Sequence, residues 1–336
     1  MQAFVIVGAV GSPYSRKLRA VFRYRQIPYR WVNSGSPESR SLPRPKISLM
    51  PQLILDGEAQ TDTTPLIREL ERRVTNERSV IPSDPAIAFL DALIEDYGYE
   101  WLTKMMFHYR WAFEADIQKA QTILPRWFGM TQSDEQLAQA GKVLAERQIE
   151  RLRVVGSNQT TAPVIEDSYA RFLDLLEDHL RAHRFVMGDR PGTSDFALFG
   201  QLTQLALFDP TSAATALERA PRVCAYTEIV EDLSGLEADD SQWVTRETLP
   251  PTLRALLIEI GRVYAPFLLA NAAALTLGSE RVECQIDGRP WTQKPFPYQG
   301  KCLKWLRDDY AQLNPNDKAF VDQTLSGTGC AAFFAT

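Results

Sequence analysis

A strand-turn-strand signature at residues 50–58 constrains the fold of this chain more than any other feature. A short apolar run enters through Pro51, and Asp56-Gly57 is a two-residue turn typical of a tight hairpin. Upstream, apolar residues 4–7, a helical pattern and residues 29–32 predict a β-α-β unit. A parallel unit that continues into a hairpin argues against an all-parallel dinucleotide fold and predicts a small mixed sheet.

The sequence beyond this hairpin is mainly helical. Residues 61–65 supply capping residues for a further helix, and residues 76–85 are polar and contain prolines, as a linker would. Helical spacing then continues through three long segments, 86–121, 135–154 and 169–183. A tight turn leads into an apolar helix over residues 196–207, and Asp195 is placed to cap its start.

Chain length predicts two or three domains, since 336 residues exceed the roughly 150 of one typical domain. We place a mixed α/β domain at residues 1–78, an all-helical domain at 86–235 and a C-terminal extension at 236–336. The extension carries an apolar helix, a hairpin turn at Asp287-Gly288 and a last amphipathic helix. Its apolar stripes need a partner surface, so we expect it to pack on the helical domain.

Composition excludes several classes of partner and site. The 37 Lys and Arg residues against 42 Asp and Glu leave a net charge of −5, without the basic excess typical of nucleic acid binding. The first residues lack the flanks of a signal peptide, and the apolar stretch 263–277 is too short to span a membrane and contains Pro266. Four cysteines without a C-x-x-C pair indicate free thiols, so we expect a cytoplasmic protein. No His, Cys, Asp and Glu cluster has the spacing of a metal site.

Four short motifs, in this order, resemble those of a glutathione transferase. The segment Ser12-Pro13-Tyr14-Ser15-Arg16 falls at the strand-to-helix turn where that family keeps its catalytic residue, and Met50-Pro51-Gln52-Leu53 matches its cis-proline element. Asp62-Thr63 stands where the family has a Glu-Ser pair, and residues 188–198 match its capping-box motif. The resemblance covers about the first 235 residues. It implies a thioredoxin-like N-terminal domain, an all-α glutathione transferase C-terminal domain, glutathione as co-substrate, and a homodimer with residues 86–121 supplying much of the interface.

The chain departs from the family pattern in three places. The Glu-Ser pair is Asp-Thr, and the capping position three residues before Asp195 is Gly192 instead of Ser or Thr. Typical members also end well before residue 336. The extra length is therefore where we expect this chain to differ from its relatives.

The resemblance assigns the thiol-activating role to Ser12. A hydroxyl at the start of a helix donates a hydrogen bond to the glutathione sulfur, and the free N–H groups of the first helical turn favour the thiolate. Ser15 and Tyr14 are the alternatives for this role, and Ser12 also suits a plain helix cap. Serines stand at both sulfur positions of a glutaredoxin-like Cys-Pro-Tyr-Cys segment, which argues against dithiol redox chemistry.

The other contacts to glutathione follow from the same resemblance. A cis peptide at Pro51 would leave the backbone of Met50 to pair with the cysteinyl backbone of glutathione, although proline is also common at the start of a strand. Asp62 and Thr63 would bind the ammonium and carboxylate groups of the γ-glutamyl end, with a plain helix cap as the alternative for Asp62. Lys46 would pair with the glycyl carboxylate or, alternatively, remain a solvated surface lysine.

A candidate pocket for the second substrate lies on the first long helical segment. Tyr97, Trp101, Met105 and His108 follow one another at helical spacing and form an apolar face, which is also typical of a core or of a dimer contact. The resemblance thus implies an enzyme that activates the glutathione thiolate for attack on a small hydrophobic electrophile, as in detoxification. A non-catalytic binding or assembly protein on the same fold is the alternative. Conjugation, isomerisation and peroxide reduction are not separated by these residues.

Overall fold

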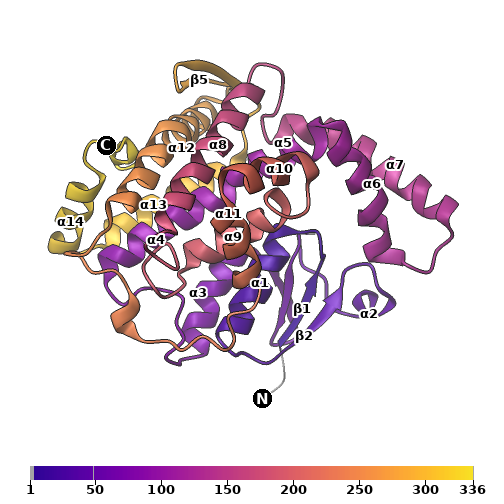
Figure 1. The fold of residues 1–336 in the computed structure, drawn as a ribbon, viewed down its shortest axis with the longest axis horizontal. Coiled ribbons are helices and arrows are strands. Elements are labelled where there is room, and N and C mark those ends of the chain that lie inside the picture. Colours follow the sequence, from indigo (N-terminus) through magenta and orange to yellow (C-terminus); the bar gives the residue numbers. More distant parts are fainter. Residues whose placement is uncertain (1–3, 48, 336) are drawn as a thin grey trace.

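The N-terminal part of the chain is built on a four-stranded mixed sheet. The computed structural model describes residues 4–47 and 49–335 (Figure 1). The strands are β1 (Phe4–Gly8), β2 (Tyr29–Asn33), β3 (Gln52–Leu55) and β4 (Glu58–Thr61), in the spatial order β2-β1-β3-β4. β2 runs parallel to β1, whereas β3 is antiparallel to β1 and β4 to β3. The helices of this part are α1 (Pro13–Tyr24), α2 (Pro37–Arg40) and α3 (Thr63–Arg73). The predicted thioredoxin-like sheet is confirmed.

Two Asp-Gly pairs form the hairpin turns because both of their residues tolerate left-handed backbone. Asp56 and Gly57 have φ values of 52° and 83°, and Asp287 and Gly288 have 52° and 72°. The first pair joins β3 to β4, and the second joins β5 (Val282–Ile286) to β6 (Arg289–Gln293). Both predicted hairpins are therefore present.

The strand register brings four loops to one edge of the sheet. Gly8 at the end of β1 lies opposite Asn33 at the end of β2, and Val7 lies opposite Gln52 at the start of β3. Gln52 lies in turn opposite Thr61 at the end of β4. The segments that follow β1, β2 and β4 and the segment that precedes β3 therefore meet at this edge, which we call the site edge.

The middle of the chain is helical, as predicted, but divided differently. It comprises α4 (Pro85–Glu100), α5 (Leu102–Ala112), α6 (Glu114–Gly129), α7 (Asp134–Glu150), α8 (Ala162–His179), α9 (Thr193–Leu205), α10 (Pro210–Arg219) and α11 (Pro221–Val230). The expected single segment 86–121 is broken at Trp101 and at Phe113. Phe113 is extended (φ −111°, ψ 133°), and Glu114 and Asp116 place negative charge in the first turn of α6, which favours a new helix start. α6 and α7 project from the body of the molecule as a hairpin (Figure 1).

The start of α9 is capped by two carboxylates. Asp195 accepts the N–H of Gly192 at 2.8 Å, so the predicted cap is confirmed. Asp91 of α4 accepts hydrogen bonds from the backbone N–H groups and the hydroxyls of Thr193 and Ser194. The bonds of Asp91, which is buried, therefore join α9 to α4 inside the core.

Helix α1 is fixed on the helical part at two points. A Cβ added to Gly200 of α9 would lie 2.6 Å from the carbonyl oxygen of Pro13, so the two helices touch through their backbones. Glu231, directly after α11, accepts hydrogen bonds from three arginines of α1: Arg16, Arg19 and Arg23. Since α1 begins directly after Ser12, these contacts also fix the position of Ser12 relative to the helical part.

The C-terminal extension wraps the side of the helical part that is formed by α4 and α8. It comprises α12 (Pro251–Leu277), the β5–β6 hairpin, α13 (Pro297–Gln312), α14 (Pro315–Leu325) and the short 3₁₀ helix η3 (Cys330–Phe333). α12 packs on α8, and α13 and α14 pack on α4 (Figure 1). The ring of Trp291 lies 5.3 Å from that of Trp101, and the ring of Phe334 lies 5.5 Å from that of Phe89.

This wrapping covers α4, the first part of the segment 86–121 that we expected to form much of a homodimer interface. From Ala86 to Glu100, no residue of α4 is exposed, because α13 and α14 lie against the helix. Asp309 of α13 also pairs with Arg68 of α3 at 2.9 Å. The side chains of α4 are therefore used within the subunit.

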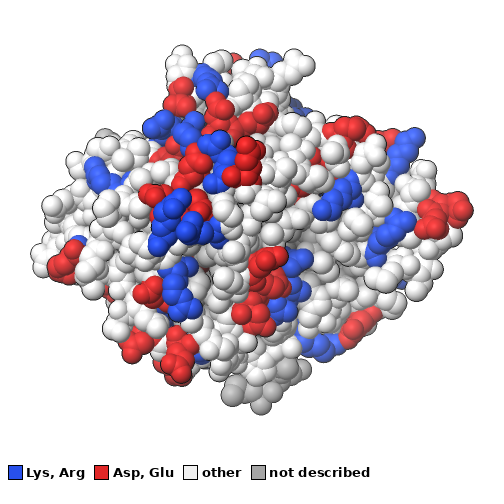
Figure 2. Space-filling view, viewed as in Figure 1, with Lys and Arg blue, Asp and Glu red and all other residues white. Residues whose placement is uncertain are grey.

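On the face in Figure 2, acidic and basic side chains lie beside one another instead of gathering by sign. In residues 4–47 and 49–335, no helix is long and apolar enough to cross a membrane. Cys224, Cys284, Cys302 and Cys330 are all free thiols.

Candidate functional site

Ser12 occupies the position directly before α1, at the site edge. Its backbone is extended (φ −94°, ψ 119°), and its hydroxyl oxygen accepts the N–H of Ser15 at 3.3 Å. Because the oxygen is the acceptor of that bond, the hydroxyl proton is left to donate to a group in front of the helix. The first-turn N–H groups of α1 add positive potential at the same place. Ser12 is thus a helix cap whose geometry also suits the stabilisation of an anion.

The two alternatives to Ser12 are engaged within the protein. Ser15 is fully buried, and its hydroxyl accepts the N–H of Ala9 at 3.2 Å, which fastens the loop before α1. The Tyr14 hydroxyl lies 2.6 Å from that of Thr103 on α5, and its ring lies 4.5 Å from that of Tyr99. Burial also raises the pKa of Tyr14, so its phenol stays protonated.

The predicted cis peptide is present between Met50 and Pro51. Pro51 is buried and Met50 half-buried at the start of β3, so this turn lies beside the end of β1. A pocket of about 290 Å³ opens next to Met50, and the segment after β2 supplies two arginines to its lining, Arg40 and Arg44. Lys46, which we expected to bind a carboxylate here, is exposed and does not line this pocket.

Arg40 and Arg44 are therefore candidate anion-binding residues that the sequence reasoning missed. Among the contacts of the described residues, neither guanidinium has an acidic partner, so both charges remain to attract an anion. In the sequence they appear only as two arginines in a polar loop, which does not by itself indicate a binding site. Only the register of β2 beside β1 shows that this loop reaches the site edge.

Asp62 and Thr63 lie at the start of α3, at the other end of the site edge. Asp62 Oδ2 accepts the hydroxyl of Tyr298 at 2.9 Å, whereas Asp62 Oδ1 and Thr63 Oγ1 are buried without a hydrogen-bond partner. Burial raises the pKa of Asp62, while the Tyr298 hydrogen bond and the nearby Lys17 ammonium oppose that rise. Asp62 makes no side-chain cap bond of ordinary geometry to α3, although the backbone of Thr64 at the start of that helix also lowers its pKa. Unpartnered buried polar atoms are rare and mark a place for a polar ligand or water.

An ion pair beneath these two residues joins three helices. Lys17 Nζ of α1 lies 2.6 Å from Glu95 Oε1 of α4 and 3.3 Å from Thr64 Oγ1 of α3. Both charged side chains are almost completely buried, so the pair is not screened by solvent. The start of α3 is thereby held in a fixed position against α1 and α4.

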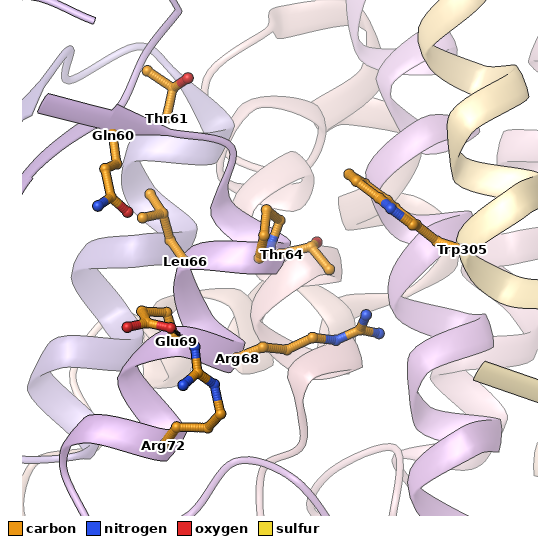
Figure 3. A pocket seen from close by; sticks show the side chains of 9 residues that line it. Gln60, Thr61, Thr64, Leu66, Arg68, Glu69, Arg72 and Trp305 are labelled. Atoms are coloured by element: carbon orange, nitrogen blue, oxygen red, sulfur yellow. Dashed lines mark ion pairs between the residues drawn. The ribbon is translucent and has the colours of Figure 1, made fainter. Parts of the chain in front are cut away.

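A larger pocket opens one helical turn further along α3. It has a volume of about 510 Å³ and lies between α3 and Trp305 of the extension (Figure 3). Thr64 and Arg68 of α3 and the indole of Trp305 face each other across it (Figure 3). The extension thus forms one wall of the space beside the start of α3.

The four residues expected to line an electrophile pocket lie in the packed interior instead. Tyr97, Trp101, Met105 and His108 are at most 3% exposed. The indole N–H of Trp101 donates to Ser168 Oγ at 2.9 Å, and the Nδ1 atom of His108 lies 2.8 Å from Ser157 Oγ. Their stripe is apolar because it faces α8 and α12, so the core alternative describes them.

An aromatic residue that the sequence analysis did not single out lies beside Ser12. A Cβ added to Gly11 would lie 2.4 Å from the Trp127 ring and 2.9 Å from Leu124 Cδ2, both on α6. The Trp127 indole is half-buried and packs against Phe208 at 5.2 Å between ring centroids. No pattern in the sequence distinguished Trp127 from other aromatic residues, because only the projection of α6 across the site edge brings it there.

The groups at the site edge are hydroxyls, guanidinium groups, helix N-termini and one carboxylate. Within 4–47 and 49–335, no three His, Cys, Asp or Glu side chains are grouped so that they could hold a metal ion.

Three similar solved structures are distant from this chain in sequence. A glutathione S-transferase from Methylobacterium radiotolerans in complex with glutathione sulfonate is 17% identical, with a TM-score of 0.39, and the match covers 73% of this chain and 98% of that chain. A beta-etherase from Sphingobium sp. is 17% identical, with a TM-score of 0.46 and 68% and 95% covered. A Tau class glutathione S-transferase from mango is 16% identical, with a TM-score of 0.40 and 74% and 96% covered. No curated protein matches the chain.

Two family models match the sequence in the order that the fold shows. Residues 6–78 match the N-terminal domain of glutathione S-transferases, which corresponds to the sheet with α1, α2 and α3. Residues 135–228 match the C-terminal domain of the same proteins, from the start of α7 into α11. The chain therefore belongs to the glutathione S-transferase family.

Proposed function

We propose that this protein binds glutathione along the site edge and activates its thiol through Ser12 for attack on an apolar electrophile. The observation that carries the proposal is the pair of unpartnered buried atoms at the start of α3, Asp62 Oδ1 and Thr63 Oγ1. One is a carboxylate oxygen and the other a hydroxyl at a helix N-terminus. Together they suit an ammonium group beside a carboxylate, which is the chemistry of the γ-glutamyl end.

The dimensions of the site edge fit a tripeptide. Neighbouring strands lie about 4.8 Å apart, so the turn after β1 and the turn after β4 are separated by about 10 Å across β3. Three extended residues span about 10 Å. With the γ-glutamyl end at Asp62 and Thr63, the cysteinyl backbone falls beside Met50 and the thiol near Ser12. The glycyl carboxylate is then received by Arg40 and Arg44 in place of Lys46.

Ser12 supplies only part of the rate acceleration in this proposal. Lowering a thiol pKa from about 8.5 to about 6.5 needs roughly 2.7 kcal/mol of interaction and raises the thiolate fraction at pH 7.4 about twelvefold. The less basic thiolate loses nearly as much nucleophilicity, since the Brønsted slope is about 0.4 to 0.5. Holding the electrophile next to the sulfur must therefore supply most of the acceleration. We assign that task to the Trp127 side of the site, in place of the stripe from Tyr97 to His108.

Calorimetric titration of the protein with glutathione tests the proposal. Wild type is compared with Ser12→Ala, and Ser133→Ala is the matched control because it removes another serine helix cap, that of α7, which is exposed. Ultraviolet titration of the bound thiol then gives its pKa. We expect wild type and Ser133→Ala to bind glutathione with a lowered thiol pKa, and Ser12→Ala to bind it with a thiol pKa closer to that in water.

Two results would contradict this reasoning in different ways. Absence of glutathione binding by wild type would remove the proposed function. Binding with an unshifted thiol pKa in both wild type and Ser12→Ala would remove Ser12 from its role and favour a non-catalytic binding protein on the same fold.

A further inference from the structure

The C-terminal extension reaches into the start of α3 through one side chain. Tyr298, the second residue of α13, places its hydroxyl 2.9 Å from Asp62 Oδ2. Its ring stacks on Tyr99 of α4 at 6.3 Å between centroids, and Trp305 contacts it edge-on at the same distance. Since rings flank it on two sides, the position of the hydroxyl is set by packing and not by the hydrogen bond alone.

The Tyr298 hydroxyl donates its hydrogen bond to only one oxygen of the Asp62 carboxylate. Oδ2 receives the phenolic proton, whereas Oδ1 is buried and has no partner. A carboxylate has room for several hydrogen bonds, so fixing one oxygen orients the other without saturating it. Thr63, which is completely buried, leaves its Oγ1 unpartnered next to it.

We propose that Tyr298 is a positioning residue of the glutathione site, which orients Asp62 so that Oδ1 receives the ammonium of the γ-glutamyl group. This inference rests on the proposed function, because it assigns the ligand of Oδ1. It gives the extension a direct part in substrate recognition and restricts the substrate to thiols with a free α-amino group at that end.

The hydrogen bond also governs the charge of Asp62. Titratable groups face this carboxyl from three elements: Lys17 on α1, Tyr99 and Glu100 on α4, and Tyr298, Lys301 and Cys302 on α13. Burial raises the pKa of Asp62, and the Tyr298 bond lowers it. Without the hydroxyl, Asp62 takes up a proton at a higher pH and then no longer attracts an ammonium group.

The test compares Tyr298→Phe with Tyr310→Phe by calorimetry with glutathione, over a pH series from about 5 to about 8. Tyr310 lies on the same helix, and its hydroxyl contacts Asp322, outside the site. We expect Tyr298→Phe to weaken glutathione binding about tenfold at pH 7, and its affinity to fall at a higher pH than that of wild type as the solution is acidified. Tyr310→Phe should match wild type in both respects.

A glutathione analogue that lacks the α-amino group separates positioning from general support of the fold. If Tyr298 acts through Asp62 and the ammonium, Tyr298→Phe should bind this analogue within twofold of wild type. An equal loss for both ligands would overturn the inference, because it would mean that the substitution disturbs the whole site.

Three further results would also decide the matter. Unchanged affinity and pH profile in Tyr298→Phe would overturn the inference and leave the proposed function standing. Tighter binding in Tyr298→Phe would overturn it as well, since the tyrosine would then compete with the ligand. Absence of binding by wild type would remove the proposed function, and the inference with it.

Discussion

Replacing Gly261 by alanine is predicted to destabilise the protein, against the ordinary preference of helices for alanine. Gly261 lies inside α12, where its Cα faces the chain segment that precedes η3. An added Cβ would lie 2.0 Å from the carbonyl oxygen of Thr328 and 2.8 Å from the Cα of Gly329. Both are backbone atoms, so no side-chain rotation relieves the clash.

The expected magnitude combines two opposing effects. Helix propensity alone favours alanine over glycine by about 1 kcal/mol. Overpacking against a fixed neighbour costs about 1–3 kcal/mol. The neighbour is fixed here, because Cys330 Sγ donates to the Leu257 carbonyl at 3.1 Å and Arg254 donates to the Ser326 carbonyl at 2.7 Å. A 2.0 Å approach to a backbone oxygen places the overpacking cost at the upper end of that range, about 3 kcal/mol. Subtracting the propensity gain of about 1 kcal/mol, we expect a net loss of about 2 kcal/mol in the free energy of unfolding.

Urea denaturation followed by circular dichroism measures this change. Gly300→Ala on α13 is the matched control, since its Cβ would meet only Leu275 Cδ1 at 2.7 Å, the far end of a side chain that can rotate. We expect the control to be neutral or slightly stabilising. Gly261→Ala as stable as wild type, or more stable, would refute the close backbone contact between α12 and the C-terminal segment.

Three other predictions concern the core and the site. Asp91→Ala should lower the free energy of unfolding by about 2–4 kcal/mol in urea denaturation, because buried N–H groups at the start of α9 lose their acceptor. Asp174→Ala, at an exposed ion pair, should cost less than about 1 kcal/mol. Equal losses would contradict the capping of α9 by Asp91 of α4. Burial raises the pKa of Glu100 to about 8, so the folded state keeps a proton on this carboxyl at pH values where the unfolded chain has lost it. The free energy of unfolding of wild type should therefore fall relative to that of Glu100→Gln as pH rises from about 4 to about 8. A pH-independent difference would mean that Glu100 is not protonated in the fold. Trp127→Ala should raise KM for an apolar electrophile several-fold in steady-state kinetics and leave KM for glutathione unchanged, whereas Met130→Ala, at an exposed side chain directly after α6, should change neither. An unchanged electrophile KM in Trp127→Ala would place the second substrate elsewhere.

Local patterns in the sequence predicted the N-terminal part well. The hairpin turn at Asp56-Gly57, the cap at Asp195 and the cis-proline at Pro51 each depend on residues within a few positions of one another. Backbone preferences of single residues are strong enough to set such turns and caps. Ser12 at the start of α1 was predictable for the same reason.

The same patterns did not show which part of the molecule packs against an apolar stripe. Helical spacing showed that Tyr97 and Trp101 share one face, but that face is covered by α8 and α12. Likewise, the break at Phe113 within segment 86–121 was not predicted. A single extended residue within a long helical pattern leaves the apolar periodicity almost unchanged. Periodicity reports burial, and it does not report the partner that buries the residue.

The sequence by itself thus determined the fold class, the hairpins, the helix caps and three of the segments that meet at the site edge, because these depend on interactions between near neighbours along the chain. Only the tertiary structure decided that Trp127 lies against Gly11, that Arg40 and Arg44 reach the same edge, and that Tyr298 bonds to Asp62 across 236 positions. Contacts at such separations depend on how the whole set of helices packs, since each helix could bury its apolar face against several partners.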